Sequence, residues 1–409
     1  MNHSPTALLV ATMDTKGQEA LFVAQCLRNE QISVLILDAG IRGKSPVATD
    51  ISRDEVAAAG GETLAGVQNI GHEGEALRVM TAGAIKCAQK LERENKIDGI
   101  IGLGGSMGTT LGTAVMRAFP VGVPKVMITT MASRDTRAFV GTKDILMLHA
   151  VCDLAGLNRI THKILSNGAG AMAGMLGRVR ADTAFDRPLV FLSTLGTTEA
   201  CVQDVRHVLE GKGKEVVIFH TVGSGGAAME EMIEQEEVAA VIDLSLHEIA
   251  DHHFDGDYDA GSHRGWAAPQ KGIPTILVPG NIDFLVSGPL EAAKRQFPGR
   301  TYHVHNAAIT VVRTNHEEIK KMARIVAELA NRSKGPLRIL VPLNGFSAFD
   351  SPQGPLPDPQ APELFAQVVQ ENLANQNNLK LLPHHINDPE FSRAIIEAFD
   401  DLLQTAFDV

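Results

Sequence analysis

The chain has 409 residues, of which 44% are hydrophobic, and a formal net charge of −11. This length is sufficient for two domains, each with its own hydrophobic core. An acidic chain without a long Lys/Arg block is a poor partner for nucleic acid or for an anionic membrane, so both are excluded as main partners. No apolar run of about 18 residues is present, which predicts that the chain does not span a membrane.

The four cysteines, at positions 26, 87, 152 and 201, are scattered, and no two form a CxxC pair. This spacing is typical of buried thiols in a reducing compartment rather than of a disulfide scaffold or a zinc site. The N-terminal residues show no basic region followed by an apolar core, so no secretory signal is predicted. We therefore expect a cytoplasmic protein.

Short apolar runs alternate with helical segments in the first half of the chain. Continuous apolar runs suit strands that are buried on both faces of a parallel sheet. Their alternation with helices predicts right-handed βαβ units. The predicted strands are 8–11, 32–37, 97–103 and 124–128, and the predicted helices are 18–27, 73–94 and 109–118.

The same order begins again at Pro188. We therefore predict an α/β protein of two Rossmann-like domains, 1–182 and 183–409, each an open, mostly parallel sheet flanked by helices. Parallel sheets bind ligands beyond the carboxyl ends of their strands, so both domains should offer a crevice on that side. In the second domain the predicted strands are 189–192, 215–219, 238–244 and 274–278, with a closing amphipathic helix over 391–407.

A glycine-rich loop gives the strongest functional signal. It follows the strand over 97–103 and opens a helix, where backbone N–H groups and the helix dipole favour an anion. The alternative interpretation is a tight turn between strand and helix. The loop is not the dinucleotide fingerprint, because the third glycine should fall at position 107, which is Met. The candidate ligand-binding residues are Gly102, Gly104, Gly105, Ser106 and Gly108.

The first predicted strand ends in a second polar cluster, Thr12, Asp14, Thr15 and Lys16. Asp14 could hold a Mg²⁺ ion that bridges phosphates, and Lys16 could neutralise phosphate charge. The alternative is that Asp14 or Thr15 caps the following helix, and one residue could do both. The strand over 124–128 ends near Thr129 and Ser133, which a parallel sheet would bring to the same crevice.

Residues 40–45 look like the end of a P-loop, but only two residues separate their glycines instead of four. Pro46 follows directly and no apolar helix opens there, so an exposed loop is the better interpretation. Arg42 or Lys44 could still reach an anion from this loop.

The second half repeats the anion-loop pattern with Gly223, Ser224, Gly225 and Gly226. His247 and His252 are five residues apart, so the HExxH spacing of a metalloprotease is absent. Two interpretations stay open for this region. In the first interpretation, these histidines and acids are ordinary surface or helix-start residues. In the second, they form a catalytic set of acids, bases or metal ligands. The catalytic candidates are His247, Glu248 and Asp283.

Taken together, these stretches resemble the Tm-one-like ATP-binding domain family over nearly the whole chain. The resemblance implies two Rossmann-like subdomains, ATP binding with Mg²⁺, and homodimers. It covers the loops of both halves, so it does not decide which half holds the nucleotide. The stretches that carry it are 11–16, 101–106, 160–170, 220–226, 279–283 and 387–391.

The sequence thus predicts an ATP-binding protein whose ligand lies at glycine-rich strand ends or in a cleft between the domains. The alternative hypothesis is a kinase- or ligase-like enzyme that acts on a small anionic metabolite, such as a sugar acid. Two loops able to hold anions would suit two substrates. A regulatory protein that binds a ligand without turning it over is a third possibility.

Overall fold

The computed structural model describes residues 4–177 and 187–407. The chain divides into two compact units, residues 1–182 and 183–409, and each is described here by itself. The predicted domain boundary near residue 183 lies outside the described residues. No helix in the described ranges is long and apolar enough to cross a membrane.

The first unit is a five-stranded parallel sheet in the order β2-β1-β3-β4-β5. Strands β1 and β3 are buried along their whole length, as their continuous apolar sequences predicted. The strands are β1 (Thr6–Ala11), β2 (Ser33–Asp38), β3 (Gly99–Gly104), β4 (Lys125–Thr129) and β5 (Leu146–His149).

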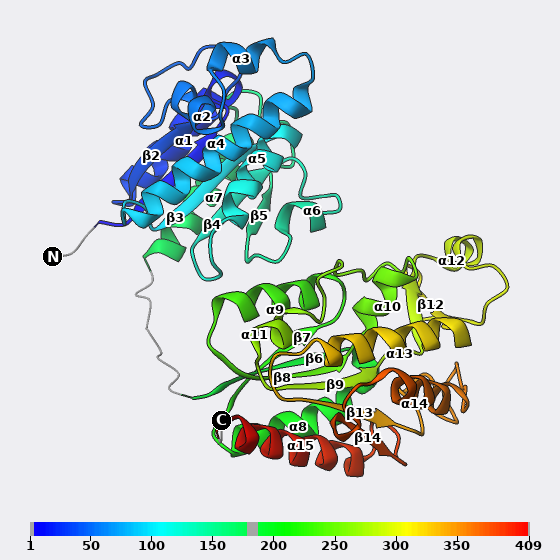
Figure 1. The fold of residues 1–409 in the computed structure, drawn as a ribbon. Coiled ribbons are helices and arrows are strands. Elements are labelled where there is room, and N and C mark those ends of the chain that lie inside the picture. The colour runs from blue at the N-terminus through cyan, green and yellow to red at the C-terminus, as the bar shows by residue number, and fades with distance from the viewer. Residues whose placement is uncertain (1–3, 178–186, 408–409) are drawn as a thin grey trace. The chain divides into compact units, whose positions relative to one another are not determined.

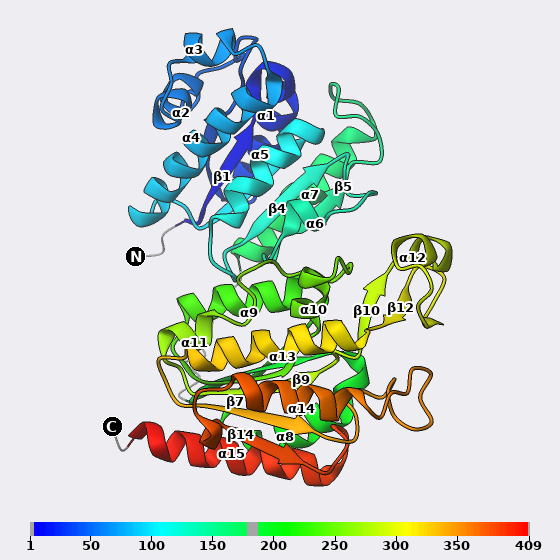
Figure 2. The same ribbon diagram turned by 45° about the vertical axis from the view of Figure 1, so that its right-hand side comes forward.

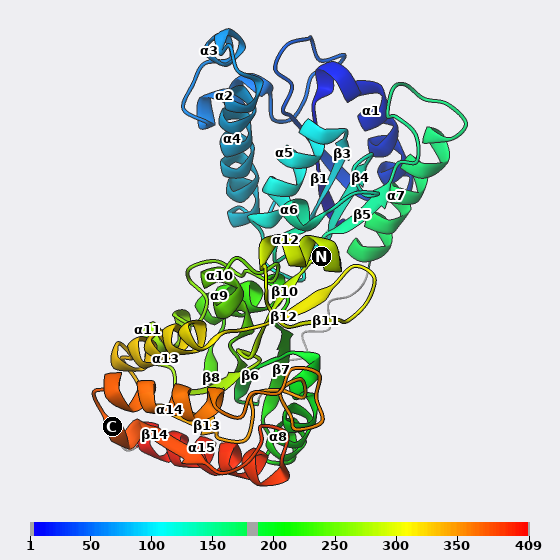
Figure 3. The same cartoon turned by 90° about the vertical axis from the view of Figure 1, so that its right-hand side faces the viewer.

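Helices cover both faces of this sheet (Figures 1 and 3). Helices α1 and α7 pack together on one face, whereas α2, α4 and α5 pack on the other. The helices are α1 (Met13–Asn29), α2 (Arg53–Ala59), α3 (Leu64–Asn69), α4 (Glu73–Arg93), α5 (Ser106–Arg117), α6 (Arg137–Val140) and α7 (Thr161–Leu176). The chain leaves β1 toward β2 and leaves β3 toward β4, so the connections diverge between β1 and β3. This position is the topological switch point, where open α/β sheets bind ligands.

The second unit is built on a six-stranded parallel sheet in the order β14-β13-β9-β8-β6-β7. Its switch point lies between β6 and β8. The prediction of two α/β domains with parallel sheets is therefore confirmed. The strands of this sheet are β6 (Leu189–Thr194), β7 (Glu215–His220), β8 (Val238–Ser245), β9 (Thr275–Gly280), β13 (Leu337–Pro342) and β14 (Leu379–Leu382).

Helices α8 and α15 pack on one face of the larger sheet, and α9, α11, α13 and α14 cover the other (Figure 1). These helices are α8 (Glu199–Gly211), α9 (Ser224–Gln235), α10 (His247–His253), α11 (Ala267–Lys271), α12 (Leu290–Gln296), α13 (His316–Asn331), α14 (Ala361–Asn372) and α15 (Pro389–Phe407).

A small antiparallel sheet, which the sequence did not predict, lies to one side of the larger sheet together with α12 (Figure 2). Its strand order is β10-β12-β11. The strands are β10 (Phe284–Ser287), β11 (Tyr302–Val304) and β12 (Thr310–Arg313).

Candidate functional site

A cavity of about 360 Å³ lies at the switch point of the first unit, beyond the carboxyl ends of β1 and β3. Its volume is in the range of small-molecule sites. The cavity brings together all four residues of the polar cluster that follows β1 and four of the five candidate residues of the glycine loop. Its lining comprises Thr12, Asp14, Thr15, Lys16, Ile41, Arg42, Val67, Gln68, Ile70, Glu73, Ala76, Gly104, Gly105, Ser106, Met107 and Gly108.

The glycine loop is shaped by a close backbone approach. A Cβ atom on Gly104 would lie 2.8 Å from the Cα atom of Gly108, so the turn requires glycine at position 104. Gly105 is the N-cap of α5, and no side chain caps the helix there. The N–H groups of the first turn, from Ser106 to Gly108, have no acceptor within the helix. They line the cavity at the positive end of the helix dipole and so favour an anion.

The segment after β1 forms the start of α1. The hydroxyl oxygens of Thr12 and Thr15 are 2.9 Å apart. One carboxylate oxygen of Asp14 accepts hydrogen bonds from the N–H groups of Arg42 and Gly43, both at 3.0 Å. Asp14 thereby holds the 40–45 loop against the cavity. The ammonium of Lys16 donates to the backbone carbonyl of Leu154.

Asp38, at the end of β2, caps α1 in the place of a local side chain. Its Oδ1 accepts hydrogen bonds from Met13 N at 3.1 Å and from Gly40 N at 2.8 Å. Burial raises the pKa of Asp38, although these two hydrogen bonds oppose the shift. Asp38 therefore supports the loops that line the cavity, and the capping role offered as an alternative for Asp14 is not seen.

On the other wall of the cavity, the sequence indicated only Arg42, as a residue that could reach an anion. Arg42 forms an exposed ion pair with Glu73, with 3.1 Å between Nη2 and the carboxylate. Three apolar residues also line the cavity: Val67 in α3, Ile70 directly after α3, and Met107 in the first turn of α5. The cavity therefore combines backbone N–H groups, two cationic side chains and apolar surface.

Three predicted residues of this unit lie outside this cavity. Gly102 is buried inside β3, where a Cβ atom would meet the sulfur of Met127 at 2.9 Å, so it serves packing. Thr129 is buried, and its hydroxyl lies 2.6 Å from that of Thr109. Ser133 lines a different cavity at the ends of β4 and β5.

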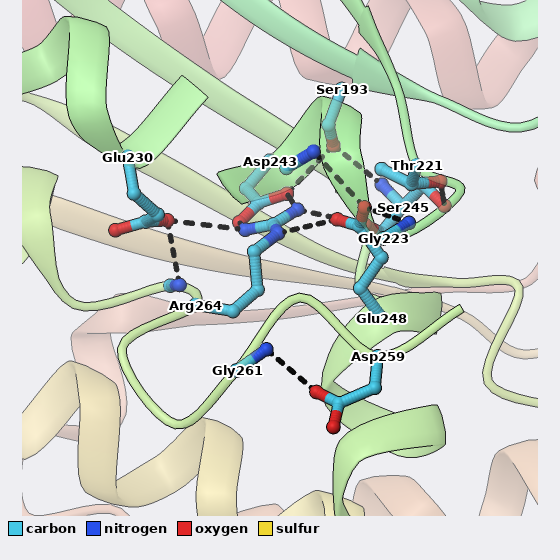
Figure 4. A network of polar contacts seen from close by, with 12 residues as sticks. Ser193, Thr221, Gly223, Glu230, Asp243, Ser245, Glu248, Asp259, Gly261 and Arg264 are labelled. Carbon is cyan, nitrogen blue, oxygen red and sulfur yellow. Dashed lines mark hydrogen bonds and ion pairs between the residues drawn. The ribbon is translucent and has the colours of Figure 1, made fainter. Parts of the chain in front are cut away.

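The glycine loop of the second unit differs from that of the first because a carboxylate of the chain occupies it (Figure 4). Oε1 of Glu248 accepts hydrogen bonds from Gly223 N at 2.7 Å and from Gly226 N at 3.0 Å. A Cβ atom on Gly226 would lie 1.7 Å from Oε2 of Glu248. Position 226 must therefore be glycine to leave room for this carboxylate. Ser224 and Gly225 belong to the same turn at the start of α9.

Arg264 neutralises the charge of Glu248 inside the unit (Figure 4). Its Nε lies 2.8 Å from Glu248 Oε2, and its two terminal nitrogens form a fork on the carboxylate of Asp243. Burial alone would lower the pKa of Arg264, but Asp243, Glu248 and Glu230 together raise it well above its ordinary value. The loop is thus closed by an internal ion network.

The remaining catalytic candidates of this unit are fully buried. Nδ1 of His247 lies 2.9 Å from the carbonyl oxygen of Asn281, and Nε2 lies 3.4 Å from Asp251. Burial lowers the pKa of His247, yet Asp251 and the other hydrogen bonds outweigh it and raise the pKa overall. Asp283 accepts a hydrogen bond from the hydroxyl of Ser347 at 2.7 Å. Burial, reinforced by the Asp350 carboxylate, raises the pKa of Asp283 to about 7.

Within the described ranges, no group of three or more His, Cys, Asp or Glu residues is arranged to hold a metal ion. His247, Glu248 and Asp283 instead have hydrogen-bond partners within the fold. A protein-only metal cage is therefore absent from this part of the chain.

Comparison with known proteins identifies relatives over the whole chain. The N-terminal domain model of the uncharacterised protein family UPF0261 matches residues 5–181, and its C-terminal domain model matches residues 187–403. A UPF0261 protein of Clostridium tetani is 34% identical over 97% of this chain and 98% of its own length. The ToMV resistance protein Tm-1(GCR237) of Solanum lycopersicum is 31% identical over 97% of this chain and 56% of its own length.

Solved structures give weaker likenesses. MurG from Acinetobacter baumannii is 13% identical over 98% of this chain and 99% of that chain, with a TM-score of 0.24. A UDP-GlcNAc 2-epimerase from Neisseria meningitidis is 8% identical over 90% of this chain and 100% of that chain, also with a TM-score of 0.24. These scores are too low to bear on the ligand of the present chain.

Proposed function

The chain belongs to the UPF0261 family, and we propose that it binds ATP in the switch-point cavity of its first unit. One observation carries the proposal. The N–H groups at the start of α5 face a cavity that also contains Lys16, Arg42 and apolar side chains. A nucleotide has matching parts, since its phosphates are anionic and its base is flat and largely apolar.

The second unit supports this assignment by contrast. Both glycine loops follow a parallel strand and open a helix, but the second one already holds the carboxylate of Glu248. A phosphate would have to displace a buried carboxylate that is paired with Arg264. At the first loop, a phosphate would displace no internal carboxylate of the described residues.

Magnesium fits this cavity as an ion shared with the phosphates. Mg²⁺ is usually bound by one or two carboxylates together with phosphates and waters, and seldom by an all-protein cage. One oxygen of Asp14 is used by the 40–45 loop, and the other has no hydrogen-bond partner among the described residues. Asp14, with the hydroxyls of Thr12 and Thr15, would hold the ion, which would offset phosphate charge.

A charge substitution at Gly105 tests the proposal. Gly105 has φ −80° and ψ −153°, and the nearest atom to an added Cβ is 3.9 Å away, so other residues fit there. Gly105→Asp would place a carboxylate at the loop, as Glu248 does in the second unit. Like-charge contact costs several kcal/mol, so we expect ATP affinity in calorimetric titration to fall at least about tenfold.

Gly105→Asn is the matched control. Asn has nearly the same shape and the same N-cap preference as Asp, but it carries no charge. We expect Gly105→Asn to bind ATP more tightly than Gly105→Asp. Equal, wild-type affinity in both variants would show that ATP does not bind at this loop.

A further inference from the structure

A second cavity in the first unit, of about 410 Å³, lies at the carboxyl ends of β4 and β5. Its walls are mostly polar and carry charges of both signs. Neither Asp153 nor the guanidinium of Arg134 forms an ion pair within the described ranges, whereas the nearby Arg137 pairs with Asp135. The lining comprises Thr130, Ser133, Arg134, His149, Val151, Cys152 and Asp153.

His149, which lines the cavity, contains an unpaired buried nitrogen within the described ranges. Its Nδ1 atom is buried and has no hydrogen-bond partner among the described residues. Leaving a buried polar atom unpaired costs about 1–3 kcal/mol, so a turn of the imidazole that brought Nδ1 to a hydrogen-bond partner in the cavity would be favourable. His149 is the last residue of β5, at the sheet edge where α/β proteins bind ligands.

The backbone beside His149 is strained. Val151 has φ +62°, which is an unusual conformation for a β-branched residue, and its side chain is 70% exposed. The N–H of Cys152 donates to the carbonyl oxygen of Ala150 across this residue. Strained residues of this kind persist where the surrounding structure enforces them, often at binding sites.

The two cavities are neighbours on one sheet edge. The N–H of Thr130, in the second cavity, lies 3.4 Å from the carbonyl oxygen of Gly104, in the first. Lys16 of the first cavity donates to the carbonyl of Leu154, the residue after Asp153. A ligand in the second cavity would therefore lie beside one in the first.

We propose that the second cavity binds a small hydroxylated organic anion. The guanidinium of Arg134 suits the two oxygens of a carboxylate or phosphate group. Asp153, His149 and the hydroxyl of Ser133 offer hydrogen-bond partners for the hydroxyl groups of the ligand. The cavity has the size of a small-molecule site. The binding of this anion does not require ATP.

Cys152 reports on occupancy of the cavity. Its alkylation by iodoacetamide can be followed by peptide mass spectrometry without ATP, with Cys26 and Cys87 as internal controls because neither lines the cavity. The probes are gluconate, for a hydroxycarboxylate, and glycerol phosphate, for a phosphate ester. At about ten times the dissociation constant, a bound probe should slow alkylation of Cys152 about tenfold and leave the controls unchanged.

Arg134→Gln should abolish this protection, whereas Arg137→Gln should retain it. Arg137 is the matched control because it lies three residues from Arg134, at the start of α6, and outside the cavity lining. Protection by gluconate identifies a carboxylate ligand, and protection by glycerol phosphate identifies a phosphate ligand. The proposal is overturned if neither probe at millimolar concentration slows Cys152 alkylation, or if Arg134→Gln keeps full protection. Either result would leave ATP binding in the first cavity untouched.

Discussion

One carboxylate oxygen of Glu248 lies 3.0 Å from the amide nitrogen of Gly226, at the point where a glycine loop would hold an anion. The corresponding loop of the first unit, at Gly105 and Ser106, has no such internal carboxylate among the described residues. Two loops that look alike in sequence therefore differ, because the N–H groups of only one of them hold a carboxylate among the described residues. This difference is the basis for the proposal that a nucleotide binds to the first unit.

Lys16→Gln should weaken ATP binding. Lys16 lines the first cavity, and a hydrogen bond from its ammonium to a phosphate would contribute about 1.5–3 kcal/mol, which corresponds to at least about tenfold in Kd. Lys44→Gln is the control, because Lys44 is exposed in the neighbouring loop and does not line the cavity. Calorimetric titration with ATP measures both. Similar losses in the two variants would mean that only the overall charge matters.

Asp14→Asn should reduce the benefit that Mg²⁺ gives to ATP binding. An amide is a much weaker magnesium ligand than a carboxylate, and Asn has nearly the same shape as Asp. The quantity to compare is the ratio of ATP affinities with and without Mg²⁺ in the variant and in the wild-type protein. An unchanged ratio would exclude Asp14 as a ligand of the ion.

Arg264→Ala should destabilise the second unit by about 3–5 kcal/mol, because it leaves Asp243 and Glu248 as buried, unpaired carboxylates. Trp266 is the single tryptophan and lies in this unit, so its fluorescence follows denaturant unfolding there. Arg206→Ala removes a surface pair with Glu210 and should cost at most about 1 kcal/mol. A loss below that value in Arg264→Ala would contradict the account of the network.

The contribution of Asp283 to stability should fall as the pH rises toward 7. Its pKa is raised from the ordinary value of 3.8 to about 7 in the folded state. The folded protein therefore holds a proton that the unfolded chain releases, and this contribution is present below pH 4 and is lost as the pH rises through about 7.

Asp283→Asn removes that titration and retains a partner for the Ser347 hydroxyl. Urea unfolding between pH 4 and 7 should give a flatter dependence of the free energy of unfolding on pH in the variant. His247 and His385, whose pKa values are also raised, titrate in both proteins and cancel in the comparison. Parallel profiles for the two proteins would show that Asp283 is ionised throughout this range.

Much of the fold could be predicted because its strands are continuous apolar runs. Strands β1 and β3 were correctly predicted to be buried. The polar and glycine-rich segments that follow them indicated where the first cavity forms. Strand β5 was not predicted, although residues 145–148 form a short apolar run, and it lies at the edge of the sheet with Leu146 45% exposed. Strands β10, β11 and β12 are three or four residues long, too short for an alternation to be recognised.

The differences between the two glycine loops could not be read from the sequence. Glu248 is 22 residues from Gly226 along the chain, and only the tertiary fold brings its carboxylate to the loop. The apolar wall of the first cavity could not be predicted either, because the tertiary fold brings its residues together. Val67 lies in α3, which has six residues and no sustained helical periodicity.

Amide hydrogen exchange with and without Mg-ATP tests the central claim most directly, because that claim concerns particular backbone N–H groups. We predict slower exchange on ATP addition in the segments 12–17 and 104–109, with the loop at 223–226 unchanged. ATP-dependent protection of 223–226 without protection of 104–109 would contradict the account and would assign the nucleotide to the second unit.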